Sequence, residues 1–264
     1  MIVITYNIFT LLYISIILWY ILITILTDNY TYMTELIYWT DTYLFEDTAS
    51  ILEISENEFW IYIILDRTIF YPQGWWQPSD TGTIKADWWI FEVTMCRLSP
   101  EWVVYHYGNK VSWDIQVWEK AKLQINEQER RFNARNHSAG HLLDIAMSEI
   151  GYNLEPWKWF HFPQGCYVEY LWEFNNETKE EFIKSLEGKI NKLVQSSIPV
   201  VVKYDDLWDL WAPTGKIPRY VSFEWYEGCG CWGTHVKNSS EIWGVKIRKV
   251  KYKKWLLKIS YKVD

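Results

Sequence analysis

Three histidines and one cysteine fall into two spaced pairs that could together bind a metal ion. The first pair is His137 and His141. On a helix, residues four apart lie on the same face, so both imidazoles could reach one ion. The second pair, Cys231 and His235, has the same spacing in a turn-rich segment. Three imidazoles and one thiolate are a natural tetrahedral donor set for Zn²⁺.

The donor count leaves open whether such a zinc is catalytic or structural. A four-ligand site is usually closed, whereas a catalytic site keeps one position free. The zinc-protease motif places a glutamate directly after the first histidine as the general base. Ser138 occupies that position here, which excludes the protease interpretation.

Charge and cysteine usage limit the partners and the compartment. The formal net charge is −7, which argues against a protein that wraps nucleic acid through bulk positive charge. Cys229 and Cys231 form a C-x-C pair near His235, which suits metal binding better than a disulfide and predicts a reducing, cytoplasmic setting. The sequence gives no indication of a stable protein partner.

A basic stretch near the C-terminus is the candidate contact for nucleic-acid phosphates. Lysines that protect the solvated edge of a hairpin are an equally good interpretation. The candidate phosphate contacts are Lys246, Arg248, Lys249, Lys251, Lys253 and Lys254.

Residues 33–125 have the pattern of a small β-barrel-like domain. Short runs rich in β-branched and aromatic residues are separated by turn sequences, which is typical of a barrel. The predicted strands are Ala49–Ser55, Glu58–Leu65, Trp88–Met95 and Glu101–Tyr107. Loops are predicted at Tyr71–Gly74 and Gln77–Gly82.

Residues 126–264 are predicted to form a mixed α+β domain. Asn126, with Glu129 three residues later, predicts the start of a helix that continues to Ile150 before Gly151. A second helix is predicted over Lys179–Gln195 from its apolar spacing. The predicted strands are Cys166–Leu171, Pro199–Tyr204, Val245–Tyr252 and Trp255–Val263.

Residues 1–32 form a separate hydrophobic segment. No charged side chain occurs from Met1 to Thr27, and this run is long enough to span a bilayer as an extra helix. It lacks the basic region and cleavage site of a signal peptide. The competing interpretation, which we favour, is that translation begins at Met33. The residues before it would then come from conceptual translation of DNA upstream of the start codon. Membrane anchoring through residues 1–27 is the alternative.

Taken together, residues 33–264 resemble the AlaX family of trans-editing proteins and the matching editing region of alanyl-tRNA synthetases. With its N-terminal barrel, the chain is similar to the longer form of AlaX. Four stretches in the same order carry the resemblance: Leu65–Pro72 leading into Gln77–Gly82; His137–Leu143; His161–Pro163 with Tyr167–Tyr170; and Cys231–Val236.

The resemblance implies a zinc-dependent hydrolase that deacylates seryl-tRNA(Ala), glycyl-tRNA(Ala) or both, with mischarged alanine tRNA as its partner and no need for ATP. It implies one Zn²⁺ per chain, with His137, His141, Cys231 and His235 as ligands. Gln77 matches the family's active-site glutamine. A pocket made for alanine cannot strongly exclude glycine or serine, so a second site must remove the wrong products. The alternative is a catalytically inactive, zinc-stabilised tRNA-binding module, tethered to a membrane if residues 1–27 are translated.

The departures from the family pattern are all of one kind. Tryptophan stands at several positions where the resemblance implies glycine: Trp75, Trp76, Trp113, Trp157, Trp159, Trp225 and Trp232. Glycine at about 7% would give roughly 18 residues, whereas the chain has 12 glycines and 19 tryptophans. We hypothesise that UGA codons for glycine have been read as tryptophan. A tryptophan-rich surface that stacks on tRNA bases is the alternative.

Overall fold

The computed structural model of the protein describes residues 33–56, 60–110, 115–172, 178–204 and 218–264. The hydrophobic segment 1–32 and Trp113 lie outside the described residues. Within the described ranges, no helix is both long enough and apolar enough to cross a membrane.

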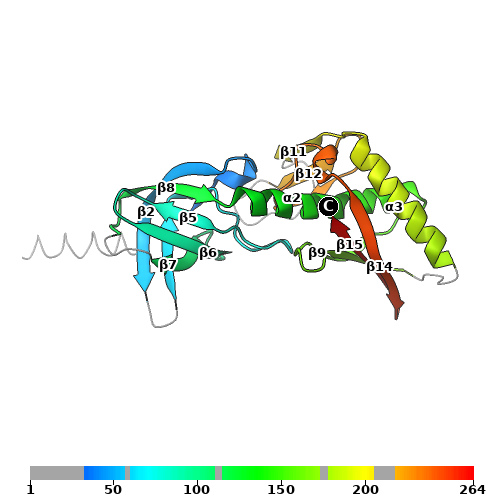
Figure 1. The fold of residues 1–264 in the computed structure, drawn as a ribbon, viewed down its shortest axis with the longest axis horizontal. Coiled ribbons are helices and arrows are strands. Elements are labelled where there is room, and N and C mark those ends of the chain that lie inside the picture. The colour runs from blue at the N-terminus through cyan, green and yellow to red at the C-terminus, as the bar shows by residue number, and fades with distance from the viewer. Residues whose placement is uncertain (1–32, 57–59, 111–114, 173–177, 205–217) are drawn as a thin grey trace, which may run out of the picture.

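Six antiparallel strands close into a barrel in the N-terminal part of the protein (Figure 1). In order around the barrel they are β2 (Glu46–Glu56), β3 (Ile61–Leu65), β7 (Val104–Lys110), β6 (Ile90–Leu98), β5 (Gly82–Lys85) and β8 (Lys120–Ile125). Alternate residues of β8 are buried, as expected for a strand with one face toward a core. Closure pairs the strand edges that would otherwise invite aggregation. The barrel prediction is confirmed.

A short segment precedes the barrel and packs on it. Strand β1 (Glu35–Leu36) pairs in parallel with β4 (Arg67–Thr68), and a single 3-10 turn, η1, covers Ile37–Trp39. Leu36, Ile37 and Tyr38 join the same hydrophobic core as the barrel interior. The N-terminal approach to the barrel is therefore part of its folded unit.

The C-terminal part is mixed α+β, as predicted. An antiparallel sheet has the order β14-β15-β10-β9, and a smaller one the order β11-β12-β13. The first sheet comprises β14 (Val245–Lys253), β15 (Leu256–Val263), β10 (Tyr167–Leu171) and β9 (Pro156–Phe160); the second comprises β11 (Val200–Tyr204), β12 (Arg219–Phe223) and β13 (Cys229–Gly230). The helices are α2 (Glu127–Glu149), α3 (Lys179–Gln195) and the 3-10 helix η3 (Ser239–Ile242).

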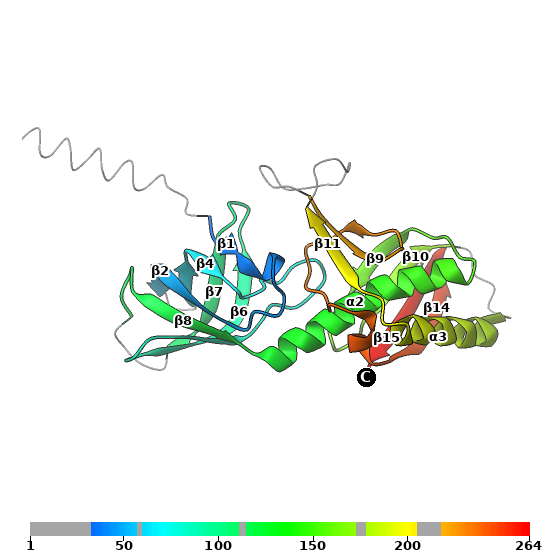
Figure 2. The same ribbon diagram turned by 90° about the horizontal axis from the view of Figure 1, so that it is seen from above.

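Helix α2 runs from the barrel into the C-terminal part (Figure 2). It starts directly after β8, where the Asn126 side chain accepts a hydrogen bond from the Glu129 amide at 3.3 Å. This N-cap satisfies one of the free donors of the first turn. The apolar face of α2, including Leu142, Leu143 and Ala146, is buried in the same core as α3. The same helix carries His137 and His141, and His137 contacts Gln77 of the barrel part.

A buried ion pair fastens the start of α2 to the barrel. Arg130 and Asp80 are both fully buried, and the Arg130 Nε lies 3.0 Å from Oδ1 of Asp80. Arg130 also donates to the backbone oxygens of Thr42 and Ile69, at 2.8 and 2.5 Å. The Tyr71 amide donates to the other oxygen of Asp80 at 2.7 Å. Both charges are therefore paired and hydrogen-bonded, which a buried ion requires.

His106 is a second buried titratable group, inside the barrel and away from the histidine pairs. Its Nε2 lies 2.8 Å from the Thr68 hydroxyl and its Nδ1 lies 3.0 Å from the Ile63 carbonyl oxygen. Burial lowers the pKa of His106 to about 4, and the hydrogen bond to Ile63 only partly opposes this. The ring is therefore neutral at pH 7.

This shift predicts a loss of stability in acid. Between pH 6.5 and about 4 the unfolded chain binds a proton at His106 and the folded chain does not, so the free energy of unfolding falls as the pH falls. The contribution amounts to about 3 kcal/mol, present in full above pH 6.5 and lost toward pH 4. Urea unfolding of the metal-free protein at several pH values should therefore show a steeper pH dependence in the parent than in His106→Gln. Parallel curves would contradict the prediction.

Most of the unusual backbone conformations belong to tryptophan. Nine described residues other than glycine have a positive φ, and seven of them are Trp75, Trp76, Trp102, Trp118, Trp225, Trp243 and Trp255, with φ between 46° and 71°. The left-handed region costs a residue with a Cβ about 1–2 kcal/mol, so seven such residues cost about 7–14 kcal/mol. The whole net stability of a folded domain is only about 5–15 kcal/mol.

Candidate metal centre

The four predicted ligands meet at one point, although the two pairs are about ninety residues apart in the sequence. The ligand atoms of His137, His141, Cys231 and His235 all lie within 4.8 Å of one another. Cys231 Sγ lies 3.2 Å from Nε2 of His137 and 3.3 Å from Nε2 of His235. Bonds of about 2.0–2.3 Å to a tetrahedral ion place neighbouring ligand atoms roughly 3.3–3.7 Å apart. The group can therefore hold a metal ion.

Each imidazole of the centre is oriented by a partner at Nδ1, so that Nε2 is left for the ion. The partner of His137 is Gln77 Oε1 at 2.9 Å, and that of His235 is the Ser138 hydroxyl at 3.3 Å. Cys229 Sγ lies 3.5 Å from Nδ1 of His141. Outer hydrogen bonds of this kind fix the ring orientation of metal-binding histidines. Cys229 thus lies beside the centre, outside the group of four.

The environment of the four side chains suits a metal ion better than any protein partner. Nε2 of His141 is buried and has no hydrogen-bond partner among the described residues. Burial lowers the pKa of His137 and His235 well below the usual range and that of His141 to about 4, so the imidazoles are neutral. Burial raises the pKa of the Cys231 thiol, which Arg219 partly opposes. Metal binding there would accordingly release the thiol proton.

Gln77 closes the centre from the side of the barrel loop. Its Oε1 accepts hydrogen bonds from His137 Nδ1 and, at 3.1 Å, from the Thr234 amide. Its Nε2 donates to the Thr234 hydroxyl at 2.8 Å. The amide is fully buried, and these contacts join the loop to both ligand-bearing segments. Gln77, the predicted active-site glutamine, therefore contacts His137 and the turn between Cys231 and His235.

Two features of the turn that carries Cys231 and His235 could not be read from the sequence pattern. The buried Arg219 of β12 donates to the carbonyl oxygens of Cys231 and Gly233, at 2.7 and 3.1 Å. A Cβ on Gly233 would lie 2.1 Å from the His137 ring, so only glycine fits there. Arg219 was missed because nothing in a five-residue strand indicates that its arginine points inward.

His161 also lies against the centre without being one of the four. Its ring stacks on that of His137 with centroids 4.3 Å apart, and its Nδ1 lies 2.9 Å from the Tyr261 hydroxyl. Tyr261 donates in turn to the Asn136 carbonyl oxygen at 2.9 Å. A Cβ on Gly140 would lie 2.3 Å from the His161 ring. His161 therefore packs against the ring of His137 and supports its position.

A groove of about 630 Å³ reaches the centre at His141 and Cys229. Asp144, one turn after His141, lines it and accepts hydrogen bonds from the Tyr170 hydroxyl at 2.6 Å and the Trp159 indole at 3.2 Å. Burial raises the pKa of Asp144 to about 7. Glu227 lies along the same groove. The approach to the metal centre thus carries acidic groups.

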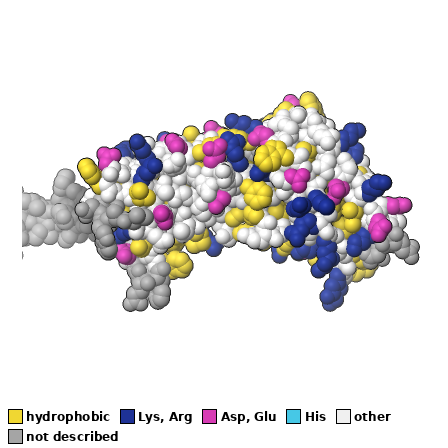
Figure 3. All heavy atoms as spheres, in the orientation of Figure 1, with side chains coloured by type: hydrophobic (Ala, Val, Ile, Leu, Met, Phe, Trp, Pro, Cys, Tyr) yellow, Lys and Arg dark blue, Asp and Glu magenta, His cyan; other side chains and the backbone are white. Residues whose placement is uncertain are grey.

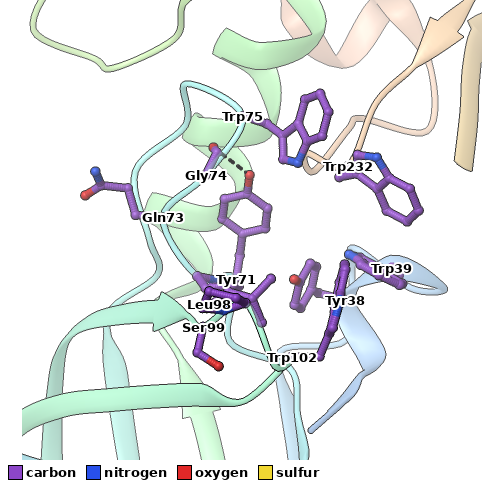
Figure 4. A pocket seen from close by; sticks show the side chains of 12 residues that line it. Tyr38, Trp39, Tyr71, Gln73, Gly74, Trp75, Leu98, Ser99, Trp102 and Trp232 are labelled. Atoms are coloured by element: carbon purple, nitrogen blue, oxygen red, sulfur yellow. Dashed lines mark hydrogen bonds between the residues drawn. The ribbon is translucent and has the colours of Figure 1, made fainter. Parts of the chain in front are cut away.

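A second cavity of about 320 Å³ lies between the barrel loops and the turn of Cys231. Figure 4 shows the indoles of Trp75, Trp102 and Trp232 around it, with Trp39 beside Trp232. Trp232 is buried, and its Nε1 has no hydrogen-bond partner among the described residues. Two of the four tryptophans that line this cavity, Trp75 and Trp232, stand where the family resemblance implies glycine.

Comparison with known proteins places the chain in a family, although it matches no family model. It is 29% identical over 232 residues to the alanyl-tRNA editing protein AlaX-L of Pyrococcus horikoshii, covering 84% of this chain and 55% of the relative. It is 30% identical over 217 residues to AlaX-M of the same organism, covering 81% of this chain and 90% of the relative.

The third comparison is with a synthetase. The chain is 31% identical over 201 residues to the alanine–tRNA ligase of Fervidobacterium nodosum, covering 72% of this chain and 23% of the ligase. It therefore spans about half the length of AlaX-L and about a quarter of the ligase, but nearly all of AlaX-M. With 30% identity to AlaX-M over most of both chains, the protein belongs to the AlaX family of alanyl-tRNA editing proteins.

Proposed function

We propose that the protein is a zinc-dependent aminoacyl-tRNA deacylase that hydrolyses seryl-tRNA(Ala), glycyl-tRNA(Ala) or both in the cytoplasm. The observation that carries this proposal is the convergence of His137, His141, Cys231 and His235 beside Gln77. The relatives named as alanyl-tRNA editing proteins support the substrate. The donor set of three imidazoles and one thiolate supports zinc as the ion.

Chemically, a bound zinc would supply positive charge to polarise water or to anchor the substrate. The protein's own residues orient the reactants. Gln77 holds the ring of His137, and Arg219 holds the backbone of the turn of Cys231. The carboxylate of Glu227 on the groove, joined by Asp144 once it ionises above its pKa of about 7, suits the ammonium group of an aminoacyl ester. Such positioning accounts for much of the rate of a hydrolase that forms no covalent intermediate.

Hydrolysis of seryl-tRNA(Ala) with and without a zinc chelator tests the proposal. We expect release of serine by the zinc-loaded protein, loss of activity after chelation and recovery on adding Zn²⁺. Alanyl-tRNA(Ala) serves as the matched substrate and should be spared. Failure of the zinc-loaded protein to release either serine or glycine would refute the proposal.

The second candidate is a zinc-stabilised tRNA-binding module without activity. The full set of four protein donors favours it, because a closed tetrahedral site is typical of structural zinc. For this candidate, chelation should lower the melting temperature and weaken tRNA binding, while no hydrolysis occurs at any zinc concentration.

Gln77 offers a sharper test of the site. Removing its amide in Gln77→Ala leaves Nδ1 of His137 without its acceptor, so we expect kcat/KM for deacylation to fall about 10–100-fold. Gln77→Glu keeps an acceptor for Nδ1 and should recover part of the activity. The exposed Gln124 of the barrel is the matched control, and Gln124→Ala should leave kcat/KM unchanged. Equal activities in all four proteins would contradict this positioning role.

The C-terminal hairpin is the proposed contact for tRNA phosphates. Lys246, Arg248, Lys249, Lys251, Lys253 and Lys254 are all exposed on β14 and its turn. Figure 3 shows Lys and Arg side chains gathered over this end of the molecule. In an acidic protein such a patch can direct the polyanion to one face.

We expect the triple change Lys249→Ala, Lys251→Ala and Lys253→Ala to weaken tRNA binding and its salt dependence. Each lost phosphate contact should reduce the slope of log affinity against log salt by about 0.7–0.9. Filter binding at several salt concentrations measures the slope. Lys120→Ala with Lys122→Ala on β8 is the control, because these lysines are exposed on the barrel. An unchanged slope in the triple variant would assign the lysines to a solvated hairpin edge.

A further inference from the structure

Tryptophan occupies the backbone positions that normally require glycine. Among the described residues, seven of the nine non-glycine residues with positive φ are tryptophans, whereas only two glycines, Gly82 and Gly151, have a positive φ. Tryptophan makes up 19 of 264 residues, so fewer than one of the nine would be tryptophan by composition. Bulky side chains are the rarest occupants of this region.

Two of the turns have a backbone geometry that strongly favours glycine. Gly74 and Gln77 exchange backbone hydrogen bonds around Trp75 and Trp76, whose φ values are 46° and 56°. Lys254 and Trp255 form the two-residue turn between β14 and β15, with φ values of 50° and 65°. Two-residue turns with both φ values positive are the type I′ turns in which Asn-Gly and Gly-Gly predominate.

Another tryptophan lies in a strained turn at the end of a helix. Trp243 follows η3 with a φ of 69° and a ψ of −59°, and the Gly244 amide donates to the Ile242 carbonyl oxygen across it at 2.9 Å. A turn of three residues with this backbone geometry is a γ-turn of the rare, strained kind. The Trp243 side chain is 67% exposed, and that of Trp225, with a φ of 68°, is 84% exposed. Neither indole is buried in a core that would offset the backbone strain.

Other tryptophans have the environment that an indole requires. Trp89 is 1% exposed, and its Nε1 donates to Glu119 at 2.8 Å. Trp159 donates to Asp144, and its φ is not positive, so the glycine implied there by the family resemblance is not supported by the backbone. Trp157 and Trp232, also expected to be glycines, have no positive φ either. The backbone therefore sets apart the seven tryptophans with positive φ from the other described tryptophans.

We propose that Trp75, Trp76, Trp102, Trp118, Trp225, Trp243 and Trp255 are glycines in the protein made by its source organism, because that organism reads UGA codons as glycine. The printed tryptophans at these seven positions then result from translating UGA as tryptophan. Trp89 and Trp159 are encoded by UGG and are true tryptophans. A surface of tryptophans for base stacking accounts for exposure but gives no reason for the left-handed backbone.

The nucleotide sequence and the native peptides test this proposal together. We expect UGA at the seven positions and UGG at Trp89 and Trp159, with glycine at the seven positions in tryptic peptides of the protein from its own cells. UGG codons at the seven positions would overturn the proposal, and so would UGA codons with tryptophan in the native peptides.

A recombinant comparison supplies a physical readout. The chain made with glycine at all seven positions should melt several degrees higher than the chain made with tryptophan, because glycine adopts these turns without strain. Trp89→Gly and Trp159→Gly are the matched controls and should lower the melting temperature. A seven-glycine chain that melts at or below the temperature of the tryptophan chain would contradict the assignment.

Discussion

The His137→Ala variant is expected to bind no zinc with measurable affinity and to lose deacylation of seryl-tRNA(Ala) by at least about 100-fold. His137 is the most connected ligand, because its Nε2 faces Cys231 while its Nδ1 is held by Gln77. Removing it leaves two imidazoles and a thiolate and also breaks the link to the barrel loop. Metal analysis of the purified variant and single-turnover hydrolysis measure the two effects.

His106→Gln is the matched control for this variant. His106 is as deeply buried as His137, but it bonds to Thr68 and Ile63 inside the barrel. It should keep one zinc per chain and the parent rate. Should His137→Ala retain a full complement of zinc, the proposed ligand set would be wrong. A different outcome concerns the parent protein. If the parent binds zinc but does not hydrolyse seryl-tRNA(Ala), the inactive module is favoured instead.

The Asp80→Ala variant is expected to lose about 3–5 kcal/mol of stability, the largest structural effect that we predict. It leaves the Arg130 guanidinium buried at the junction of the barrel and α2 without a counter-charge. The loss follows from the desolvation of an unpaired charge, whose full cost then falls on the folded state. Urea unfolding at pH 7 measures it.

Two comparisons make this prediction specific. Glu127→Ala removes an exposed ion pair with Arg131 from the same helical turn and should cost less than about 1 kcal/mol. The double variant Asp80→Leu with Arg130→Met should recover much of the loss, because no charge is left unpaired. Similar stabilities for Asp80→Ala and Glu127→Ala would contradict the role assigned to the buried pair.

Local patterns were enough to predict the helices and most of the long strands. The Asn126 cap and the apolar spacing of α3 place both helices within a residue of their bounds. The unpredicted strands are the short β1, β4, β5 and β13 and the longer β8, β9 and β12, and β5 begins at the end of the predicted loop Gln77–Gly82. The strict alternation of burial in β8 was readable in Lys120–Ile125, whereas β9 begins with a proline and β12 contains a buried arginine, which argue locally against a strand.

The metal ligands could be proposed from spacing, but their surroundings could not. The pairing of Asp80 with Arg130 joins residues fifty positions apart, and Gln77 meets His137 across sixty. No periodicity or spacing rule indicates such contacts, because they depend on how the barrel is set against α2. The resemblance to AlaX proteins identified Gln77, and only the folded chain identifies Arg219 as a support for the turn of Cys231.

The order of the ligands along the chain has a consequence for biosynthesis. The barrel strands and α2 leave the ribosome first and carry two of the four proposed ligands, and His235 follows His141 by ninety-four positions. At about 5–20 residues per second, the two imidazoles wait roughly 5–19 seconds for the rest of the centre. With the proposed ligand set, the nascent protein would complete its barrel before it could bind an ion tightly, and metal binding would be a late event in its assembly.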